Sequence, residues 1–149
     1  MRLPMALGSI LLGASQALAS GGISCETASK PANITFQGGV TRGMGAPIYS
    51  FEGSFRTANK AVAQDLRALS FTREHLAQYW LDGKELRLVL YREREGDKPH
   101  GYVEITVLTK AAGDEGTYKG KFSATVFDAT TDPDGRRTEL AGRISCFVE

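Results

Sequence analysis

Alternating apolar and polar positions dominate the second half of the chain. In Glu85–Glu93, for example, Leu86, Leu88 and Leu90 share one face. Three more stretches alternate in the same way, with polar, glycine-bearing loops between them: Gly101–Lys110, Thr117–Asp128 and Thr138–Val148. A period of two with turn signals between the runs is typical of antiparallel strands that pair in chain order. The pattern therefore predicts an antiparallel β-meander.

The first half of the chain predicts three further strands by the same criterion. They are Ile23–Thr27, Asn33–Val40 and Ile48–Thr57. Lys30-Pro31 separates the first two, because proline removes a ladder donor. Gln37–Pro47 holds several glycines and is predicted to be a flexible connection.

The middle segment, Ala58–Leu81, does not alternate clearly. Its apolar residues suit one or two short helices, and Thr72 is a suitable N-cap for the second one. Gly83 would then follow the end of that helix. The alternative is a hairpin in which Asp82-Gly83 forms a tight turn. We favour the helical interpretation, whose second helix would carry Leu76, Tyr79 and Trp80.

Three predicted strands share a glycine flanked at two residues by large apolar side chains. The central glycines are Gly53, Gly120 and Gly142. A missing side chain at such a position lets a sheet bend sharply or lets a ring lie over the backbone. We therefore expect a mainly β fold, a single antiparallel β-meander domain closed into a small barrel or a half-closed sandwich.

The N-terminus has the pattern of a secretory signal peptide. Arg2 precedes an apolar stretch, Met5–Leu18, that is too short to span a bilayer and ends at the small-residue motif Ala17-Leu18-Ala19. Residues 1–19 are thus a predicted signal peptide, and residues 20–149 a single exported β-rich domain in the periplasm or outside the cell. Cleavage after residue 19 of the 149-residue chain leaves 130 residues, enough for one ordinary core.

The chain has two cysteines, Cys25 and Cys146, close to the two ends of the predicted domain. An oxidising compartment favours a disulfide between them. Lipidation of Cys25 is the alternative, but Gly22 and Ser24 do not match the residues that such a site requires. A bond between Cys25 and Cys146 would tie the first strand to the last.

Charge balance bears on the class of partner. Removal of Arg2 leaves 17 basic and 17 acidic residues, a formal balance of zero. Binding to nucleic acid or anionic lipid draws on a surplus of Lys and Arg, so neutrality argues against both. No other apolar run is long enough for a transmembrane helix, and we expect no stable membrane insertion of the mature chain.

Sequence motifs give little support for catalysis or metal binding. His75 and His100 belong to no ligand set with metal-binding spacing, and no nucleophile motif occurs. Thr130–Gly135 resembles a calcium loop only in part, and a tight turn explains it better. We expect no cofactor and no metal, and a non-enzymatic function is favoured. Several carboxylates remain candidates for a catalytic pair, because the sequence does not give the distances between them: Glu52, Asp65, Glu104 and Glu115.

These observations favour a small exported, non-catalytic envelope or secreted domain that binds another protein. One alternative is a carrier of a small apolar ligand inside a β-barrel, and a second is an unrecognised hydrolase. Trp80 is a candidate binding residue because it is large and amphipathic. Arg42 and Met44 are candidates because they lie at the centre of Gln37–Pro47, a polar loop with little to bury.

Overall fold

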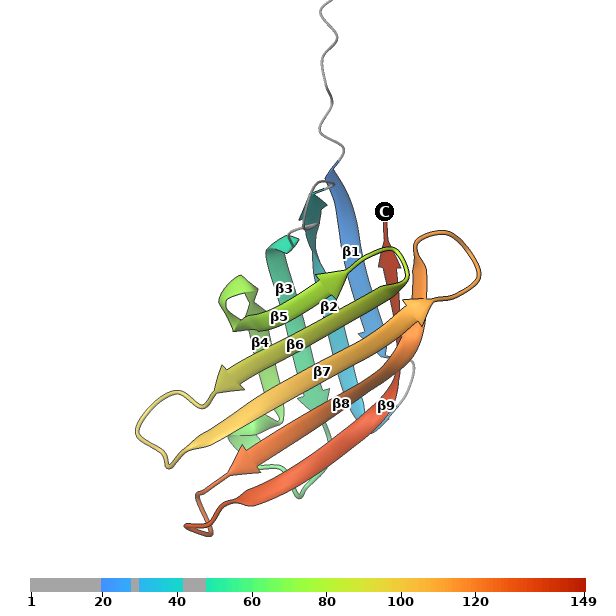
Figure 1. Cartoon of the computed structure of the whole chain (residues 1–149). Coiled ribbons are helices and arrows are strands. Elements are labelled where there is room, and N and C mark those ends of the chain that lie inside the picture. Colours follow the sequence, from blue (N-terminus) through green and yellow to red (C-terminus); the bar gives the residue numbers. More distant parts are fainter. Residues whose placement is uncertain (1–19, 28–29, 42–47) are drawn as a thin grey trace, which may run out of the picture.

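The computed structural model describes residues 20–27, 30–41 and 48–149, and within them nine strands form one antiparallel sheet (Figure 1). The strands of the first half are β1 (Ser20–Thr27), β2 (Ala32–Thr41), β3 (Ile48–Thr57) and β4 (Ala68–Thr72). Those of the second half are β5 (Leu76–Leu81), β6 (Glu85–Glu93), β7 (Gly101–Ala111), β8 (Thr117–Asp128) and β9 (Arg136–Val148). The predicted mainly β meander is confirmed, and the sheet curls into a nearly closed barrel.

The sheet is closed where the two ends of the chain meet. Its strand order is β4-β3-β2-β1-β9-β8-β7-β6-β5, so the first and last strands are neighbours. Cys25 lies opposite Cys146 in the β1–β9 register, and a disulfide joins them. The turns β5–β6 and β7–β8 lie at one end, called the upper end, and the turns β6–β7 and β8–β9 lie at the lower end.

The sheet is open between β4 and β5, its two outermost strands. Eight antiparallel pairings separate them, so β4 and β5 run in the same direction. A single-turn 3-10 helix, η2 (Arg73–His75), connects them. The segment therefore acts as one interrupted strand, whose first part pairs with β3 and whose second part pairs with β6.

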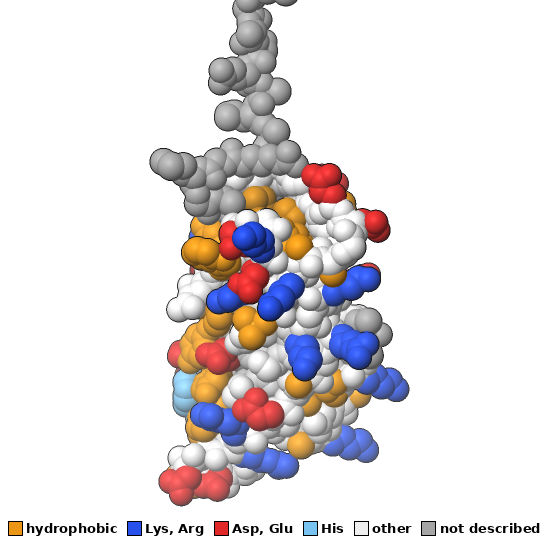
Figure 2. Space-filling model, turned by 45° about the vertical axis from the view of Figure 1, so that its right-hand side comes forward, with side chains coloured by type: hydrophobic (Ala, Val, Ile, Leu, Met, Phe, Trp, Pro, Cys, Tyr) orange, Lys and Arg blue, Asp and Glu red, His pale blue; other side chains and the backbone are white. Residues whose placement is uncertain are grey.

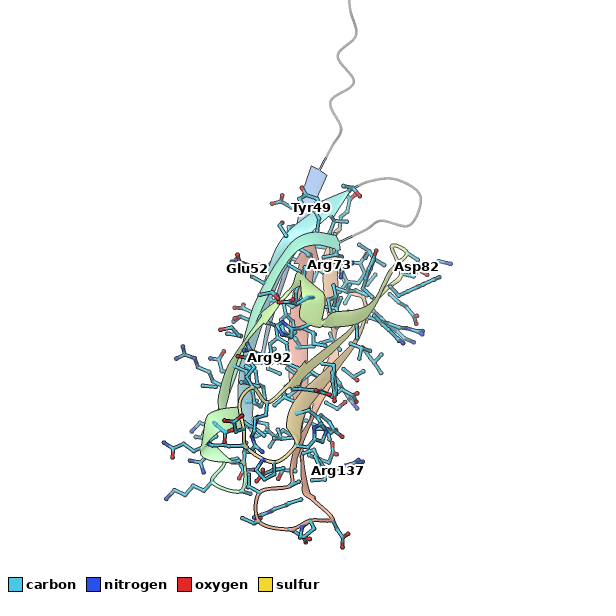
Figure 3. The ribbon with its side chains drawn as sticks, turned by 90° about the vertical axis from the view of Figure 1, so that its left-hand side faces the viewer. Tyr49, Glu52, Arg73, Asp82, Arg92 and Arg137 are labelled. Atoms are coloured by element: carbon cyan, nitrogen blue, oxygen red, sulfur yellow. A yellow bond between two sulfur atoms is a disulfide. The ribbon has the colours of Figure 1, made fainter. Side chains whose placement is uncertain are left out.

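Two arginine side chains bridge this opening, which faces the viewer in Figure 3. Arg73 donates from Nε to the carbonyl oxygen of Ile48 on β3, at 3.0 Å. Arg92, on β6, donates to the carbonyl oxygen of Ser70 on β4. Side chains thus satisfy backbone acceptors where the strands do not pair.

The interior of the barrel is filled by apolar side chains from both halves of the sheet. The largest fully buried ones include Phe51, Phe55, Phe71 and Phe122. Phe36 packs between two of these rings, with centroids 5.6 Å from Phe51 and 6.4 Å from Phe71. Burial of such a core from one face of each strand explains why the alternation in the sequence located the strands.

The expected helix at positions 72–81 is wrong, and the hairpin alternative is correct. Leu76–Leu81 is β5, and only the single turn η2 follows Thr72. The register of β5 against β6 shifts between Leu76 and Gln78. This bulge changes the phase of alternation, so Leu76 and Tyr79 both face inward at a spacing of three, which resembles a helical one, and Leu81 follows at the usual strand spacing of two. The other helical stretch is reduced to a 3-10 turn, η1 (Gln64–Leu66).

The predicted connection Gln37–Pro47 is shorter than expected. Its first part belongs to β2, which continues to Thr41 through a register shift between Gln37 and Gly39. Ile48 begins β3, and residues 42–47 lie outside the described part of the chain. The bulge absorbs the glycines without ending the strand.

The glycines of the repeated motif have the expected close neighbours. A Cβ atom on Gly53 would lie 2.4 Å from the Phe36 ring, and one on Gly142 would lie 2.7 Å from the Phe122 ring. At Gly120 the neighbour is backbone instead, because a Cβ atom would lie 2.0 Å from the carbonyl oxygen of Leu108. Rings over bare backbone and a close strand approach therefore shape the coiled sheet.

Residues 1–19, the predicted signal peptide, lie outside the described residues. No helix within the described part of the chain is long and apolar enough to cross a membrane.

Candidate functional site

Trp80 lies on the outer face of β5, at one end of a row that crosses five strands. Pairing places Trp80 opposite Arg87, Arg87 opposite Leu108, Leu108 opposite Lys121, and Lys121 opposite Arg143. We call these five residues the tryptophan row. Trp80 and Leu108 are each 56% exposed, more than the other exposed large apolar side chains of the described residues, Tyr49 and Phe147. Two apolar anchors therefore flank an arginine on an accessible surface.

The β5–β6 turn fixes the position of Trp80 against Arg87. Asp82 accepts hydrogen bonds at 2.9 Å from the backbone N–H groups of both Lys84 and Glu85. These bonds hold the pKa of Asp82 below its ordinary value. Gly83 has φ of +82°, a conformation that glycine adopts without strain. An Asp-Gly turn of this kind sets the register of the hairpin.

A hollow of about 740 Å³ is lined by residues of β5 and β6, with Leu108 of β7 and Arg73 of η2. Trp80, Leu108 and Arg87 contribute to it, together with Tyr79 and Arg73. The Arg73 guanidinium lies 5.7 Å from the centre of the Tyr79 ring. The hollow thus combines aromatic and aliphatic surface with two guanidinium groups, and such surfaces are enriched in protein interfaces.

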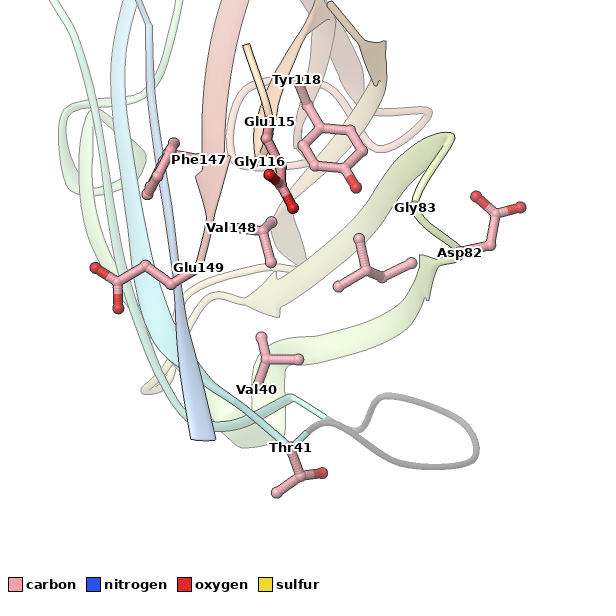
Figure 4. Close-up of a pocket in the computed structure, with 11 residues that line it drawn as sticks. Val40, Thr41, Asp82, Gly83, Glu115, Gly116, Tyr118, Phe147, Val148 and Glu149 are labelled. Atoms are coloured by element: carbon pink, nitrogen blue, oxygen red, sulfur yellow. The ribbon is translucent and has the colours of Figure 1, made fainter. Parts of the chain in front are cut away.

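A second hollow, of about 670 Å³, opens at the upper end of the barrel (Figure 4). Tyr118 and Val148 supply apolar surface there, while Asp82 and Glu115 supply carboxylates. Burial raises the pKa of Tyr118, and the charge of Asp82 raises it further. The phenol is therefore neutral at physiological pH and available as a hydrogen-bond donor.

Arg94 closes the lower end of the barrel, a feature that sequence reasoning missed. Its side chain is 3% exposed and forms ion pairs with Asp65 at 2.7 Å and Asp128 at 2.8 Å. Burial raises the pKa of both carboxyl groups, but hydrogen bonds outweigh this effect and lower the pKa of each overall. The carboxylates come from distant parts of the sequence, and no local motif connects them with Arg94. The cluster is structural, because the charges satisfy one another.

A cluster of aromatic rings on the lower outer face also lacked a sequence signal. Tyr102 and Phe127 stack with centroids 5.4 Å apart, and Tyr91 lies 5.2 Å from Tyr102. Burial and a hydrogen bond to Glu93 raise the pKa of Tyr91 to about 12. His100 packs against two of these rings. Only the β6–β7–β8 register, which the sequence does not state, brings these residues together.

The two histidines have structural surroundings. His75 accepts a hydrogen bond from the backbone N–H of Thr72 at 3.0 Å and so completes the cap of η2. His100 belongs to the aromatic cluster. Among the described residues, no group of three or more His, Cys, Asp or Glu side chains is placed to hold a metal ion.

The candidate carboxylates lie in separate parts of the fold. Glu52 is exposed on β3, Glu104 is exposed on β7, and Glu115 lies in the upper β7–β8 turn. Asp65 is engaged with Arg94 at the lower end. The 132–135 stretch is a tight turn, in which the N–H of Gly135 donates to the carbonyl oxygen of Asp132. The turn interpretation of that stretch is therefore correct.

Of the three predicted binding residues, Trp80 lies on the tryptophan row, while Arg42 and Met44 lie outside the described residues. Sequence reasoning identified the aromatic anchor but not its neighbours on the row, because these come from four other strands. No protein-family model, curated protein or solved structure matches the chain.

Proposed function

We propose that this protein is an exported, non-catalytic interaction module that binds another protein through the tryptophan row. The proposal rests on one observation above all. Trp80 and Leu108 are each 56% exposed on one outer face, with Arg87 between them in register. Tryptophan and arginine are the residue types most enriched among interface residues whose truncation costs the most affinity.

The surroundings of the row support this proposal. The row stands on strands rather than loops, and the Asp82 turn and the filled core hold those strands in place. A rigid platform reduces the entropy that is lost on binding. The disulfide between β1 and β9 is compatible with an oxidising, exported compartment.

Site-specific photo-crosslinking of the exported protein tests the proposal. A photoreactive aromatic residue, which keeps a large apolar side chain at the anchor position, replaces Trp80 or Leu108 in two variants and Arg56, exposed on β3, in a control. We expect one discrete protein adduct from positions 80 and 108 and none from position 56. A further variant, Trp80→Ala, is expected to reduce the adduct from position 108 by tenfold or more, since interface tryptophans often contribute about 2 kcal/mol. The same adduct pattern at all three positions would show the proposal to be wrong.

A carrier of a small apolar ligand is the second candidate, and the hollow at the upper end favours it. The interior below that hollow is filled by rings, so a ligand would have to lie against Tyr118 and Val148 near the opening. Native mass spectrometry of the purified protein tests this candidate. A bound small molecule that is lost in Val148→Glu, but retained in Trp80→Ala, would favour the carrier.

A further inference from the structure

Cations gather on the face that carries the tryptophan row, although the expected mature chain is neutral overall. Five of them point outward from β6 to β9, and we call them the basic face: Arg87, Lys110, Lys119, Lys121 and Arg143. Figure 2 shows Lys and Arg side chains spread over this side of the molecule. Glu85 lies beside them at the start of β6 and forms an ion pair with Arg87.

The remaining four cations form no ion pair with any described residue. Two cross-strand pairs even place like charges directly opposite each other. Lys110 lies opposite Lys119, and Lys121 lies opposite Arg143. Like charges in directly opposed positions destabilise a sheet. Glu85 lies opposite Lys110 on its other side and offsets that charge, whereas neither Lys121 nor Arg143 has an acidic residue opposite it in the registers of β7, β8 and β9. Folding therefore gives no reason for the Lys121–Arg143 pair, whereas attraction of an anionic partner does.

Acidic residues border the basic face on both sides. Asp82, Asp114 and Glu115 lie in the turns at the upper end, while Glu104 and Glu139 point outward nearer the lower end. A broad anionic surface, such as a membrane, would come close to these carboxylates as well as to the cations. A narrow anionic segment would contact the cations alone. The borders therefore favour a narrow partner that lies along the row.

We infer that the partner presents a short, extended acidic segment with an apolar end, an inference that rests on the proposed protein-binding function. The apolar end lies over Trp80 and Leu108, and the acidic residues continue over Lys121 and Arg143. Four steps between neighbouring strands, at about 4.8 Å each, make the row roughly 19 Å long, or about six residues of extended peptide. Charge complementarity of this kind fixes the orientation of the partner and speeds its association.

Fluorescence of Trp80 tests the inference directly, because it is the only tryptophan of the chain. The oxidised exported domain is titrated with a synthetic peptide of two leucines followed by four glutamates, whose length matches the row. Control peptides replace the glutamates by lysines or the leucines by serines. We expect a change in Trp80 emission with the first peptide, at least tenfold weaker binding of the serine control, and no binding of the lysine control.

Charge-reversed variants show whether the basic face is responsible for binding of the acidic peptide. Lys119→Glu/Lys121→Glu is expected to weaken peptide binding about tenfold or more at low salt, and the difference should shrink in about 0.5 M NaCl through screening. Both substitutions lie on exposed positions of β8, and each replaces a like-charge cross-strand pair by an opposite-charge pair, so folding is not impaired. The matched control, Arg56→Glu/Lys60→Glu, changes the net charge equally on another part of the surface and should alter binding less than twofold.

The outcomes separate this inference from the proposed function. The inference of an acidic segment is wrong if both double variants bind the acidic peptide equally well. It is also wrong if the wild-type protein does not bind that peptide up to millimolar concentration. Binding to phosphatidylglycerol vesicles without binding of the acidic peptide overturns it in favour of a lipid surface. If crosslinks from position 80 persist with a partner that lacks an acidic stretch, the protein-binding function stands and the acidic segment is wrong.

Discussion

Cys25 on β1 lies directly opposite Cys146 on β9, and their Cα atoms are 4.0 Å apart. The bond between them therefore coincides with the pairing that closes the barrel. Backbone pairing continues on both sides of it, from Ile23 opposite Val148 to Thr27 opposite Ile144. The covalent link and the hydrogen-bond ladder thus stabilise the same junction between the two ends of the chain.

Removal of the disulfide is expected to lower stability without abolishing the fold. The bond joins residues 121 positions apart, and a loop of that length corresponds to about 4–5 kcal/mol in the chain-entropy model. Urea unfolding of Cys25→Ser/Cys146→Ser should show a lower midpoint and unchanged strand content by circular dichroism. The reduced wild-type protein is the control and should match the double variant. An unfolded double variant would mean that the ladder cannot hold the junction alone.

The strands could be predicted from the sequence because one face of each is buried. Ile48–Thr57, Glu85–Glu93 and Thr117–Asp128 have the same bounds in the sequence pattern and in the structure. The alternation pattern did not predict β5, because a bulge between Leu76 and Gln78 changes which side chains of the strand face inward. A spacing of three between inward residues then resembles a helix, and nothing local distinguishes the two.

The candidate site could be predicted only in part. Trp80 was identifiable as a large amphipathic residue, but its exposure depends on the phase of β5 after the bulge. Its neighbours Arg87 and Leu108 depend on the registers of two hairpins. Likewise, neutral composition concealed the basic face, since a count of charges does not say which strands present them. The pairing of Arg94 with Asp128 was unpredictable because 34 residues separate the two.

Loss of Arg94 is expected to destabilise the lower end of the barrel. Arg94→Met leaves Asp65 and Asp128 without their buried cation, and breaking a buried pair in this way costs about 3–5 kcal/mol. Urea unfolding at pH 7 measures the change. Arg56→Met, at an exposed position of β3, is the control and should lie within about 0.5 kcal/mol of the wild type. Equal stabilities of the two variants would contradict a structural role for Arg94.

The same ion pairs predict how stability depends on pH. The pKa values of Asp65 and Asp128 are lowered in the folded protein, so their contribution is complete above the unfolded pKa, about 3.9. It is lost as the pH falls through the lower, folded pKa values. In Arg94→Met the Thr130 hydrogen bonds to Asp128 and the Lys98 charge beside Asp65 remain, but the lowering effect of the guanidinium is lost, so both pKa values move back toward their unfolded values. Its unfolding free energy should therefore fall less between pH 5 and pH 2 than that of the wild type, as urea unfolding across this range would show.

Glycine substitutions should distinguish two causes of crowding in the sheet: a neighbouring backbone that cannot move and an aromatic ring that can. Gly120→Ala places a Cβ atom 2.0 Å from the carbonyl oxygen of Leu108, which cannot move without breaking the β7–β8 ladder. Gly53→Ala meets the Phe36 ring at 2.4 Å, and that side chain can be replaced. We expect both to cost at least about 1–3 kcal/mol, the usual range for overpacking. Gly22→Ala, whose nearest neighbour would be 3.8 Å away, is the control.

Phe36→Leu distinguishes the two causes when it is combined with each alanine. The smaller side chain relieves the contact with Gly53→Ala, so this pair should be less destabilised than the sum of its single variants. The same replacement leaves the Leu108 carbonyl oxygen in place, so its effect should simply add to that of Gly120→Ala. Thermal and urea unfolding of the single and double variants provides both comparisons. Additive behaviour in the Gly53 pair would mean that the Phe36 ring does not rest on the backbone of β3.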